Sequence, residues 1–220
     1  LSGLVGSEMC IRDREIIMES SKIPFADYFY HLRENPKWLL KLIIFIVLSV
    51  LLAIVTIMGT DLDKVLQQSN LHGQQLANAK KISMIGSMVS GLFSSFLQLL
   101  ILFVIILVIS KIANKDVKGK SLFSATLSFM VITLLIGLVV GAIQLIFGLP
   151  IKDYTITSLN IFDKGNKILG AFNLQTLIAA YFFGLIFYST SKFSGRTSLI
   201  LGILYLIINI GFALLGASVS

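Results

Sequence analysis

The sequence predicts an all-α fold, an integral membrane bundle of five transmembrane helices with an N-terminal amphipathic helix at the membrane interface. The first observation is composition: 56% of the 220 residues are hydrophobic and 13% are charged, whereas a soluble domain has roughly 25% charged residues. The second is a set of charge-free runs that are long enough to cross a membrane. The third is that these runs do not alternate polar and apolar residues, as strands of a membrane barrel would. Because the backbone in hydrocarbon must satisfy its own hydrogen bonds, such runs predict α-helices.

The first 14 residues are set apart as an adapter-derived artefact. Residues 4–14 resemble the translation of an adapter that is used in preparing sequencing libraries. Segments that come from processing or cloning do not belong to the fold. The only cysteine, Cys10, lies here, so it gives no information on disulfides. The rest of the chain divides into a cytoplasmic segment at 15–37 and a transmembrane domain at 38–220.

The segment before the first span has the pattern of a short amphipathic helix. Pro24 is suited to the first turn, where its missing N–H would have no partner in any case. Four apolar residues then follow at helical spacing, and they are Phe25, Tyr28, Phe29 and Leu32. Asn35 precedes Pro36 and so avoids the α region, which ends the helix. We expect this helix to lie on the cytoplasmic membrane surface, either as a simple anchor or as an element that docks on lipid or a partner.

Five charge-free runs account for most of the remaining chain. They lie at 42–58 (extended at its start by 38–41), 84–110, 121–148, 168–190 and 197–219. A spanning helix needs about 20 apolar residues. The second and third runs are the longest, which predicts tilted helices or ends that project beyond the hydrocarbon. The polar loop at 61–81 is expected to extend a neighbouring span, and the loop at 149–167 to cap the bundle or to fold back on the interface.

The loops predict which side of the membrane each end faces. The short loops at 111–120 and 191–196 are rich in lysine and arginine, and in a five-span chain they share the side of the N-terminus. Positively charged short loops favour the cytoplasm. The sequence therefore predicts a multi-pass protein of the inner (plasma) membrane with a cytoplasmic N-terminus and an external C-terminus.

The chemistry-bearing residues are sparse. No Asp, Glu, Lys, Arg or His lies within the five runs, which argues against a proton-coupled pump or a voltage sensor. The two histidines, His31 and His72, do not have metal-binding spacing, and no phosphate-binding loop is present. No base is placed to activate an intramembrane serine. We therefore expect no enzymatic activity, no cofactor, no metal and no nucleic-acid partner.

Uncharged polar residues within the runs form a candidate intramembrane cluster: Gln98, Thr133, Tyr181, Tyr205 and Asn209. Such groups make hydrogen bonds between helices or line a path for a substrate, and both interpretations stay open. Gly137 and Gly141 have the spacing that lets helices approach closely. They are interpreted either as internal packing or as the seam of a homodimer.

The order of features resembles the Yip-domain (Ypt-interacting-protein-like) family, especially its bacterial branch, over residues 25–220. The resemblance rests on Glu34-Asn35-Pro36-Lys37, Ser121-Leu122-Phe123-Ser124, Gly148-Leu149-Pro150, the segment 184–189 and Ser194-Gly195-Arg196. It implies a five-helix membrane protein without known chemistry. The Asp-Tyr-Gly-Pro signature of the eukaryotic members is absent, so the resemblance does not imply binding of Rab-type GTPases.

These observations favour a non-enzymatic multi-pass membrane protein that organises the membrane or binds partners. Its candidate contacts are the amphipathic N-terminal helix and the basic loop with Lys115, Lys118 and Lys120. Each of these lysines would attract anionic headgroups by about 1 kcal/mol. Its partners would be the lipid bilayer and other membrane proteins or a second copy of the chain. The alternative is a small-molecule permease or channel subunit lined by the intramembrane polar cluster.

Overall fold

The computed structural model describes residues 23–60, 73–151 and 154–219. The longer helices are α2 (Ala26–Glu34), α3 (Trp38–Met58), α5 (Gln74–Ile112), α6 (Gly119–Ile146), α8 (Leu174–Leu185) and α9 (Gly195–Val219). The π-helical segment η3 (Ile186–Thr190) continues α8, and η2 (Leu159–Ile161) and α7 (Lys167–Gly170) are short. Within the described ranges the only β pairing is a single bridge between Ser158 and Asn173. The all-α class is confirmed. The predictions for residues 1–22 and 61–72, His72 included, lie outside the described residues.

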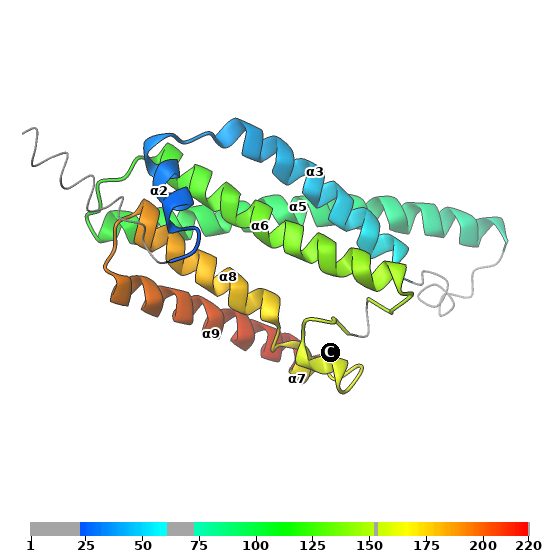
Figure 1. Ribbon diagram of the computed structural model, residues 1–220. Helices are drawn as coiled ribbons and strands as arrows, with labels where there is room; N and C mark the ends of the chain where they lie inside the picture. Colours follow the sequence, from blue (N-terminus) through cyan, green and yellow to red (C-terminus); the bar gives the residue numbers. More distant parts are fainter. Residues whose placement is uncertain (1–22, 61–72, 152–153, 220) are drawn as a thin grey trace, which may run out of the picture.

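The five longer helices after α2 run back and forth along one bundle. In Figure 1, α3, α6 and α9 run away from the end where α2 lies, and α5 and α8 return to it. The loops at 113–118 and 191–194 therefore lie at the same end as α2. The predicted grouping of these two loops with the N-terminal segment agrees with this arrangement.

Among the described residues, four helices are long and apolar enough to cross a membrane: α3, α5, α6 and residues Gly195–Ser218 of α9. The fourth predicted run, at 168–190, is not one helix, which corrects that expectation. Its apolar helix is Leu174–Thr190, with 12 residues in α8 and 5 in η3. At about 1.5 Å per residue it reaches about 25 Å, which is less than the roughly 30 Å of a hydrocarbon core. The break arises because the backbone of Asn173 is extended. The Asn173 side chain caps α8 by accepting a hydrogen bond from the backbone N–H of Gln175.

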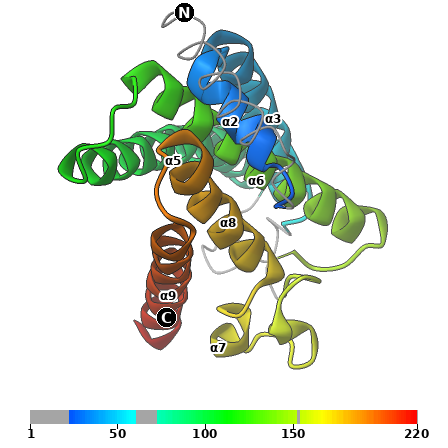
Figure 2. The same ribbon diagram turned by 60° about the vertical axis from the view of Figure 1, so that its left-hand side comes forward.

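The segment from 154 to 173 folds into a hook at the end away from α2 (Figure 2). Gln144 is 1% exposed and holds the hook, because its Nε2 donates to the Tyr154 carbonyl at 2.9 Å. The Gln175 side chain donates to Thr157 Oγ1 at 3.0 Å from the other side. The loop expected at 149–167 thus folds back on its own bundle.

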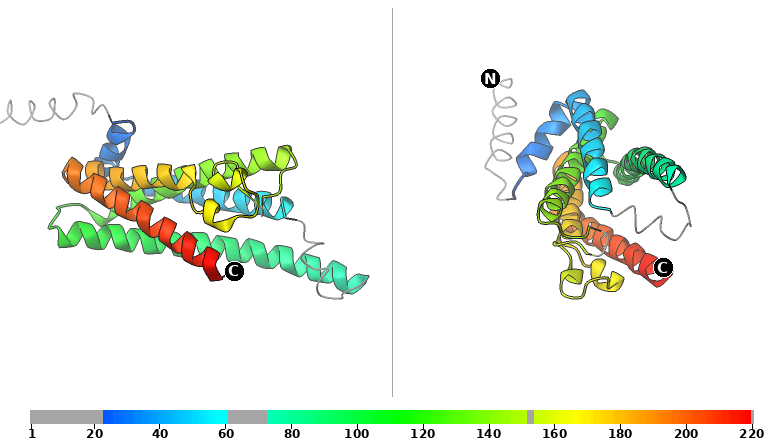
Figure 3. Two further views of the ribbon diagram at one scale, coloured as in Figure 1. Left: turned by 90° about the horizontal axis from the view of Figure 1, so that it is seen from below. Right: turned by 90° about the vertical axis from the view of Figure 1, so that its right-hand side faces the viewer.

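Helix α5 is the longest element and projects beyond its neighbours at the end away from α2 (Figure 3). It begins at Gln74, so residues 74–81 extend the second predicted span as a helix. Figure 3 also shows α9 running obliquely, with its C-terminal end turned away from α3 and α6. Most large side chains of α5 and α9 are exposed, and lipid would cover them.

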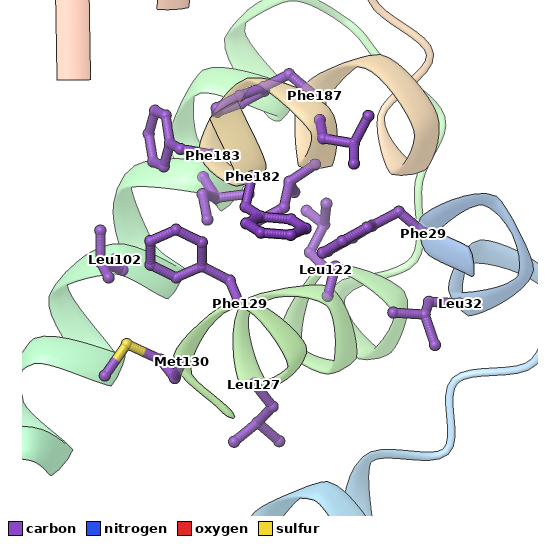
Figure 4. Close-up of a cluster of buried hydrophobic side chains, with 14 of the residues drawn as sticks. Phe29, Leu32, Leu102, Leu122, Leu127, Phe129, Met130, Phe182, Phe183 and Phe187 are labelled. Atoms are coloured by element: carbon purple, nitrogen blue, oxygen red, sulfur yellow. The ribbon is translucent and has the colours of Figure 1, made fainter. Parts of the chain in front are cut away.

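The hydrophobic core lies at the α2 end of the bundle. On α6, every residue from 121 to 130 except Phe123 is buried, whereas most residues after 130 are partly exposed. Figure 4 shows Phe129 of α6 among Phe29, Phe182, Phe183 and other core side chains. The bundle is therefore tightly packed near α2 and looser towards its other end.

Glycines set two of the helix contacts. A Cβ on Gly141 would lie 3.1 Å from Val55 of α3. The side of α6 that carries Gly137 and Gly141 therefore packs against α3 of the same chain. The closest approach is between α8 and α9, where Gly184 and Gly202 face each other. A Cβ on Gly202 would lie 2.9 Å from the Ala180 carbonyl oxygen, and one on Gly184 would lie 2.8 Å from that of Ser198.

Candidate functional site

Helix α2 forms where the sequence predicts it, but the bundle covers much of its apolar face. Phe29 is 0% exposed and Leu32 is 6% exposed, because α2 packs on α6 and η3. This corrects their expected role as contacts with lipid or a partner. Phe25 and Tyr28 are 58% and 42% exposed and stay available for such contacts. Helical periodicity marks an apolar face without saying whether lipid or protein covers it.

Hydrogen bonds fix α2 to the ends of its neighbours. Thr190 Oγ1 donates to the Phe29 carbonyl at 3.0 Å, and Ser121 Oγ donates to the Arg33 carbonyl at 2.8 Å. The Arg33 guanidinium donates to the Thr190 carbonyl at 2.8 Å and also to the Asp116 carbonyl. The Thr190 carbonyl lies at the end of η3, where carbonyls lack intrahelical partners and carry partial negative charge, so a guanidinium suits it. Arg33 thereby joins three segments that are distant in sequence.

Two cation–π contacts join the same three segments. The Lys192 ammonium lies 5.5 Å from the ring centre of Tyr30, and that of Lys115 lies 5.1 Å from the ring centre of Phe193. We call the surface formed by α2, residues 113–118 and residues 191–194 the cap. The cap is held as one unit by side chains from each of its parts.

The cap and its borders are basic. The exposed cations here are Lys37, Lys111, Lys118, Lys120, Lys192 and Arg196. Of the three loop lysines predicted to contact lipid or a partner, Lys118 and Lys120 are exposed, and Lys115 is half-buried over Phe193. The cap itself also has three exposed acids, Asp27, Glu34 and Asp116, so most of the net positive charge at this end of the bundle comes from the cations at its borders.

Lys41, in the extension of the first predicted run, has contacts that the sequence did not predict. Its ammonium donates to Ser124 Oγ at 3.1 Å and lies 5.2 Å from the ring centre of Tyr28. The Tyr28 hydroxyl in turn donates to Ser128 Oγ at 3.1 Å. Lys41 thus links α3 to α2 and α6 beneath the cap. A lone lysine at the start of an apolar run was the only signal.

Four of the five predicted polar residues meet in one cavity between α5, α6, α8 and α9. This cavity, which we call the chamber, has a volume of about 220 Å³. Its polar lining comprises Gln98, Thr133, Tyr205 and Asn209 together with Asn173, Gln175 and Thr176. Tyr181 is not part of it, because its hydroxyl lies elsewhere and donates to the Pro24 carbonyl. The sequence contained the signal for Asn173, Gln175 and Thr176 only as polar residues near one end of the fourth run.

The chamber side chains make no hydrogen bonds across helices at mid-bundle. Thr133 Oγ1 donates to the Phe129 and Met130 carbonyls of its own helix. Asn209 Nδ2 donates to the Tyr205 carbonyl, also within one helix, at 2.8 Å. In the described parts of the chain, Gln98 has no hydrogen-bond partner. The interpretation of these residues as packing links between helices therefore lacks support from their contacts.

Aromatic rings close the chamber on the side of the cap. The Phe183 and Tyr205 rings stack with centres 4.5 Å apart, and the Phe129 ring lies 6.1 Å from that of Tyr205. On each of their helices these residues lie nearer to the cap than the chamber polar groups do. Phe129 and Tyr205 line the chamber on this side, and Phe183 packs behind Tyr205, so these rings obstruct the way from the chamber towards the cap.

A second, mostly apolar cavity opens beside the chamber between α5 and α9. We call it the groove; its volume is about 440 Å³, and it shares Gln98, Tyr205 and Asn209 with the chamber. The rest of its lining is apolar except Ser94. The two cavities therefore form one site with a polar part and an apolar part.

The site offers hydrogen bonds rather than acid–base or metal chemistry. No Asp, Glu, Lys, Arg or His lines the chamber or the groove. Among the described residues, no three His, Cys, Asp or Glu side chains are grouped to hold a metal. His31 is exposed on α2. The geometry can bind an uncharged polar group, and it holds no nucleophile with an adjacent base.

The family model for the Yip1 domain matches residues 21–217. The match extends from before α2 to near the end of α9, so it includes the cap, the chamber and the groove. Neither a curated protein nor a solved structure matches the chain. A match over most of the length, together with several apolar helices, shows that the chain is a multi-pass membrane protein that belongs to the Yip1-domain family.

Proposed function

We propose that this protein is a non-enzymatic member of the family that organises the inner (plasma) membrane or binds partners there through its cap. The observation that carries the proposal is that Arg33 and two cation–π pairs hold three distant segments together as one basic surface. A surface that is already ordered loses little conformational entropy when it binds. Phe25 and Tyr28 add exposed aromatic area next to the positive charge.

Anionic lipid headgroups are the simplest ligand for this surface. A lysine or arginine near an anionic membrane surface contributes about 1 kcal/mol of attraction. Lys118 and Lys120 are exposed on adjoining positions where α6 begins. A protein partner would need acidic side chains to use the same charges.

The experiment measures how much phosphatidylglycerol copurifies with the protein in mild detergent, by mass spectrometry. The double variant Lys118→Gln/Lys120→Gln loses about 2 kcal/mol of attraction, so we expect it to bind this lipid up to about thirtyfold more weakly. The matched control, Lys80→Gln/Lys81→Gln, removes two lysines from the other end of the bundle and should retain the wild-type amount. High salt should weaken the wild-type interaction, because screening shortens the range of exposed charges. Equal retention by the cap variant and the control would contradict lipid binding by the cap.

We also propose five crossings with the N-terminus in the cytoplasm and the C-terminus outside. The back-and-forth order of the helices and the absence of charge from Leu174–Thr190 support a fifth crossing by α8 and η3. Reporter fusions after Lys115 and after Ser220 test it. We expect a cytoplasmic signal from the first and an external signal from the second. A cytoplasmic signal from the C-terminal fusion would reject the five-crossing arrangement.

One observation favours the second candidate, a small-molecule permease or channel subunit. The chamber gathers Gln98, Thr133 and Asn209 at mid-bundle, as a polar path would. Its aromatic floor opposes this function, because Phe129, Phe183 and Tyr205 would have to move for a solute to pass. Proteoliposomes that take up a small neutral solute such as glycerol faster than empty vesicles would support the permease. A flux equal to that of empty vesicles would reject it.

A further inference from the structure

We propose that the chamber and the groove together bind a neutral glycerolipid, with its uncharged glycerol headgroup in the chamber and an acyl chain in the groove. This site is separate from the cap, and it does not depend on the function proposed for the cap. It assigns a ligand class to a cavity in which Gln98 has no hydrogen-bond partner among the described residues.

Gln98 is the chamber side chain that most clearly needs a partner. It is exposed in the apolar part of α5, beside the exposed Leu97 and Ile101, and it has no hydrogen-bond partner among the described residues. A side-chain amide has two donors and two acceptor positions. Hydrocarbon supplies neither, so an unpaired amide is strongly disfavoured there. A bound polar group that donates and accepts hydrogen bonds would remove this cost.

The lining selects an uncharged headgroup. All seven polar residues of the chamber are amides or hydroxyls, and no ionisable acid or base other than the Tyr205 phenol is present. A phosphate or an ammonium would enter a low-dielectric site without an opposite charge, which is costly. Amide and hydroxyl side chains can each donate and accept hydrogen bonds. A hydroxyl group on a ligand can also do both, so it can pair with any of these side chains. A glycerol headgroup with free hydroxyls has this chemistry and is small enough for a cavity of about 220 Å³.

The groove indicates that the ligand carries a hydrocarbon chain. The groove has about twice the volume of the chamber and shares three residues with it, so a single molecule can occupy both. Its walls include Leu97 and Ile101 of α5 and Ile208 of α9, which are between 46% and 51% exposed. Lipid tails are as apolar as these side chains, so the groove itself adds little affinity. The groove orients the acyl chain of the ligand. The hydrogen bonds to the headgroup make the site prefer this ligand over the other lipids of the bilayer.

The aromatic rings on the cap side of the chamber favour residence of a ligand over its passage. Phe129, Phe183 and Tyr205 stop a headgroup from moving towards the cap. The molecule would enter sideways from the membrane between α5 and α9, along the groove. Because α9 packs chiefly on α8 and turns away from α3 and α6, no other helix of the described ranges covers this side of the bundle.

The test uses the full chain in phosphatidylcholine nanodiscs with a diacylglycerol probe that has a photoreactive group in its acyl chain. Peptide mapping after illumination is expected to place the label on the groove faces of α5 and α9. Excess unlabelled diacylglycerol should compete with the probe, whereas phosphatidic acid and free glycerol should not. Label spread evenly over α3 and α5, without competition, would show ordinary surrounding lipid and overturn the proposal. Competition by free glycerol would also overturn it, because the ligand would then be a soluble polyol.

Matched variants test the two parts of the site. Gln98→Leu removes a polar group from the chamber and is expected to lower the labelling about fivefold. Tyr181→Phe removes a hydroxyl of the same predicted cluster that lies outside the chamber, and it should leave the labelling unchanged. Leu204→Trp fills the groove from an exposed position and removes no polar group, so it should also reduce the labelling even if Gln98→Leu fails to fold. Wild-type labelling in both Gln98→Leu and Leu204→Trp would refute the assignment. The cap variant Lys118→Gln/Lys120→Gln should label normally, which separates this proposal from that for the cap.

Discussion

Replacing Gly202 with alanine is expected to loosen the contact between α8 and α9. The new Cβ would lie 2.9 Å from the Ala180 carbonyl oxygen and 3.6 Å from the Gly184 Cα. Carbon and oxygen atoms in close contact lie about 3.3–3.6 Å apart. The two helices would therefore have to separate by about half an ångström. The Ala180 oxygen belongs to the helix backbone and cannot move away by a side-chain rotation.

The expected cost is about 1–3 kcal/mol, which is typical of inserting a methyl group into a packed site. Part of the strain would reach the chamber, because Phe183 of α8 stacks on Tyr205 of α9 with ring centres 4.5 Å apart. The matched control is Gly211→Ala on the same helix, where a Cβ meets nothing within 4 Å. Alanine favours a helix over glycine by up to about 1 kcal/mol, so the control should be neutral or slightly stabilising.

The assay is thermal denaturation of the purified protein in one detergent, followed by size-exclusion chromatography with fluorescence detection. Gly202→Ala is expected to lower the apparent Tm by about 2–12 °C, on the scale known for chains of this length. Gly211→Ala should leave it unchanged or raise it. If Gly202→Ala melts no lower than Gly211→Ala, the close approach of α8 and α9 does not carry the stability assigned to it.

Three further changes test the remaining structural contacts. Arg33→Met removes the guanidinium that joins the cap. It should lower the free energy of unfolding by about 1.5–3 kcal/mol for each charged hydrogen bond lost, and it should speed proteolysis within the cap. Glu34→Gln, a change at an exposed neighbour, should have neither effect. Gln144→Leu leaves the backbone at 154–156 without its side-chain partner; it should lower the Tm and raise hydrogen exchange there, and unchanged exchange would contradict the role of Gln144. Asn173→Ala removes the N-cap of α8 and should cost about 1 kcal/mol, measured as faster exchange confined to the first turn of α8; equally fast exchange in wild type would contradict capping.

The sequence predicted the helices well where a long apolar run has no interruption. The run at 84–110 lies inside α5, which begins ten residues earlier at Gln74. The run at 121–148 starts inside α6 and ends two residues beyond its last residue, Ile146. The fourth run was the exception, because its apolar residues continue through the break at Asn173. Hydropathy does not register an N-cap, which depends on the bridge with Ser158 and on the local backbone.

The candidate sites were predictable to different extents. The polar cluster was predictable because an uncharged polar residue in an apolar run is conspicuous, and four of its five members do line the chamber. Tyr181 could not be assigned correctly, because its helix turns it towards Pro24 instead. The links of Arg33 to the Asp116 and Thr190 carbonyls were beyond prediction, because backbone groups carry no sequence signal.

By itself, the sequence determined that the chain is a bundle of apolar helices in a membrane, and in what order its helices follow one another. These properties depend on hydropathy and on the need of each segment to satisfy its own backbone, which are local. Only the tertiary structure decided that α2 folds onto the bundle, that Gly184 meets Gly202, and that Gln98 lies beside Asn209. The reason is that each depends on how closely and at what angle two helices approach. That approach is the sum of many long-range contacts, and the periodicity of a single helix does not contain it.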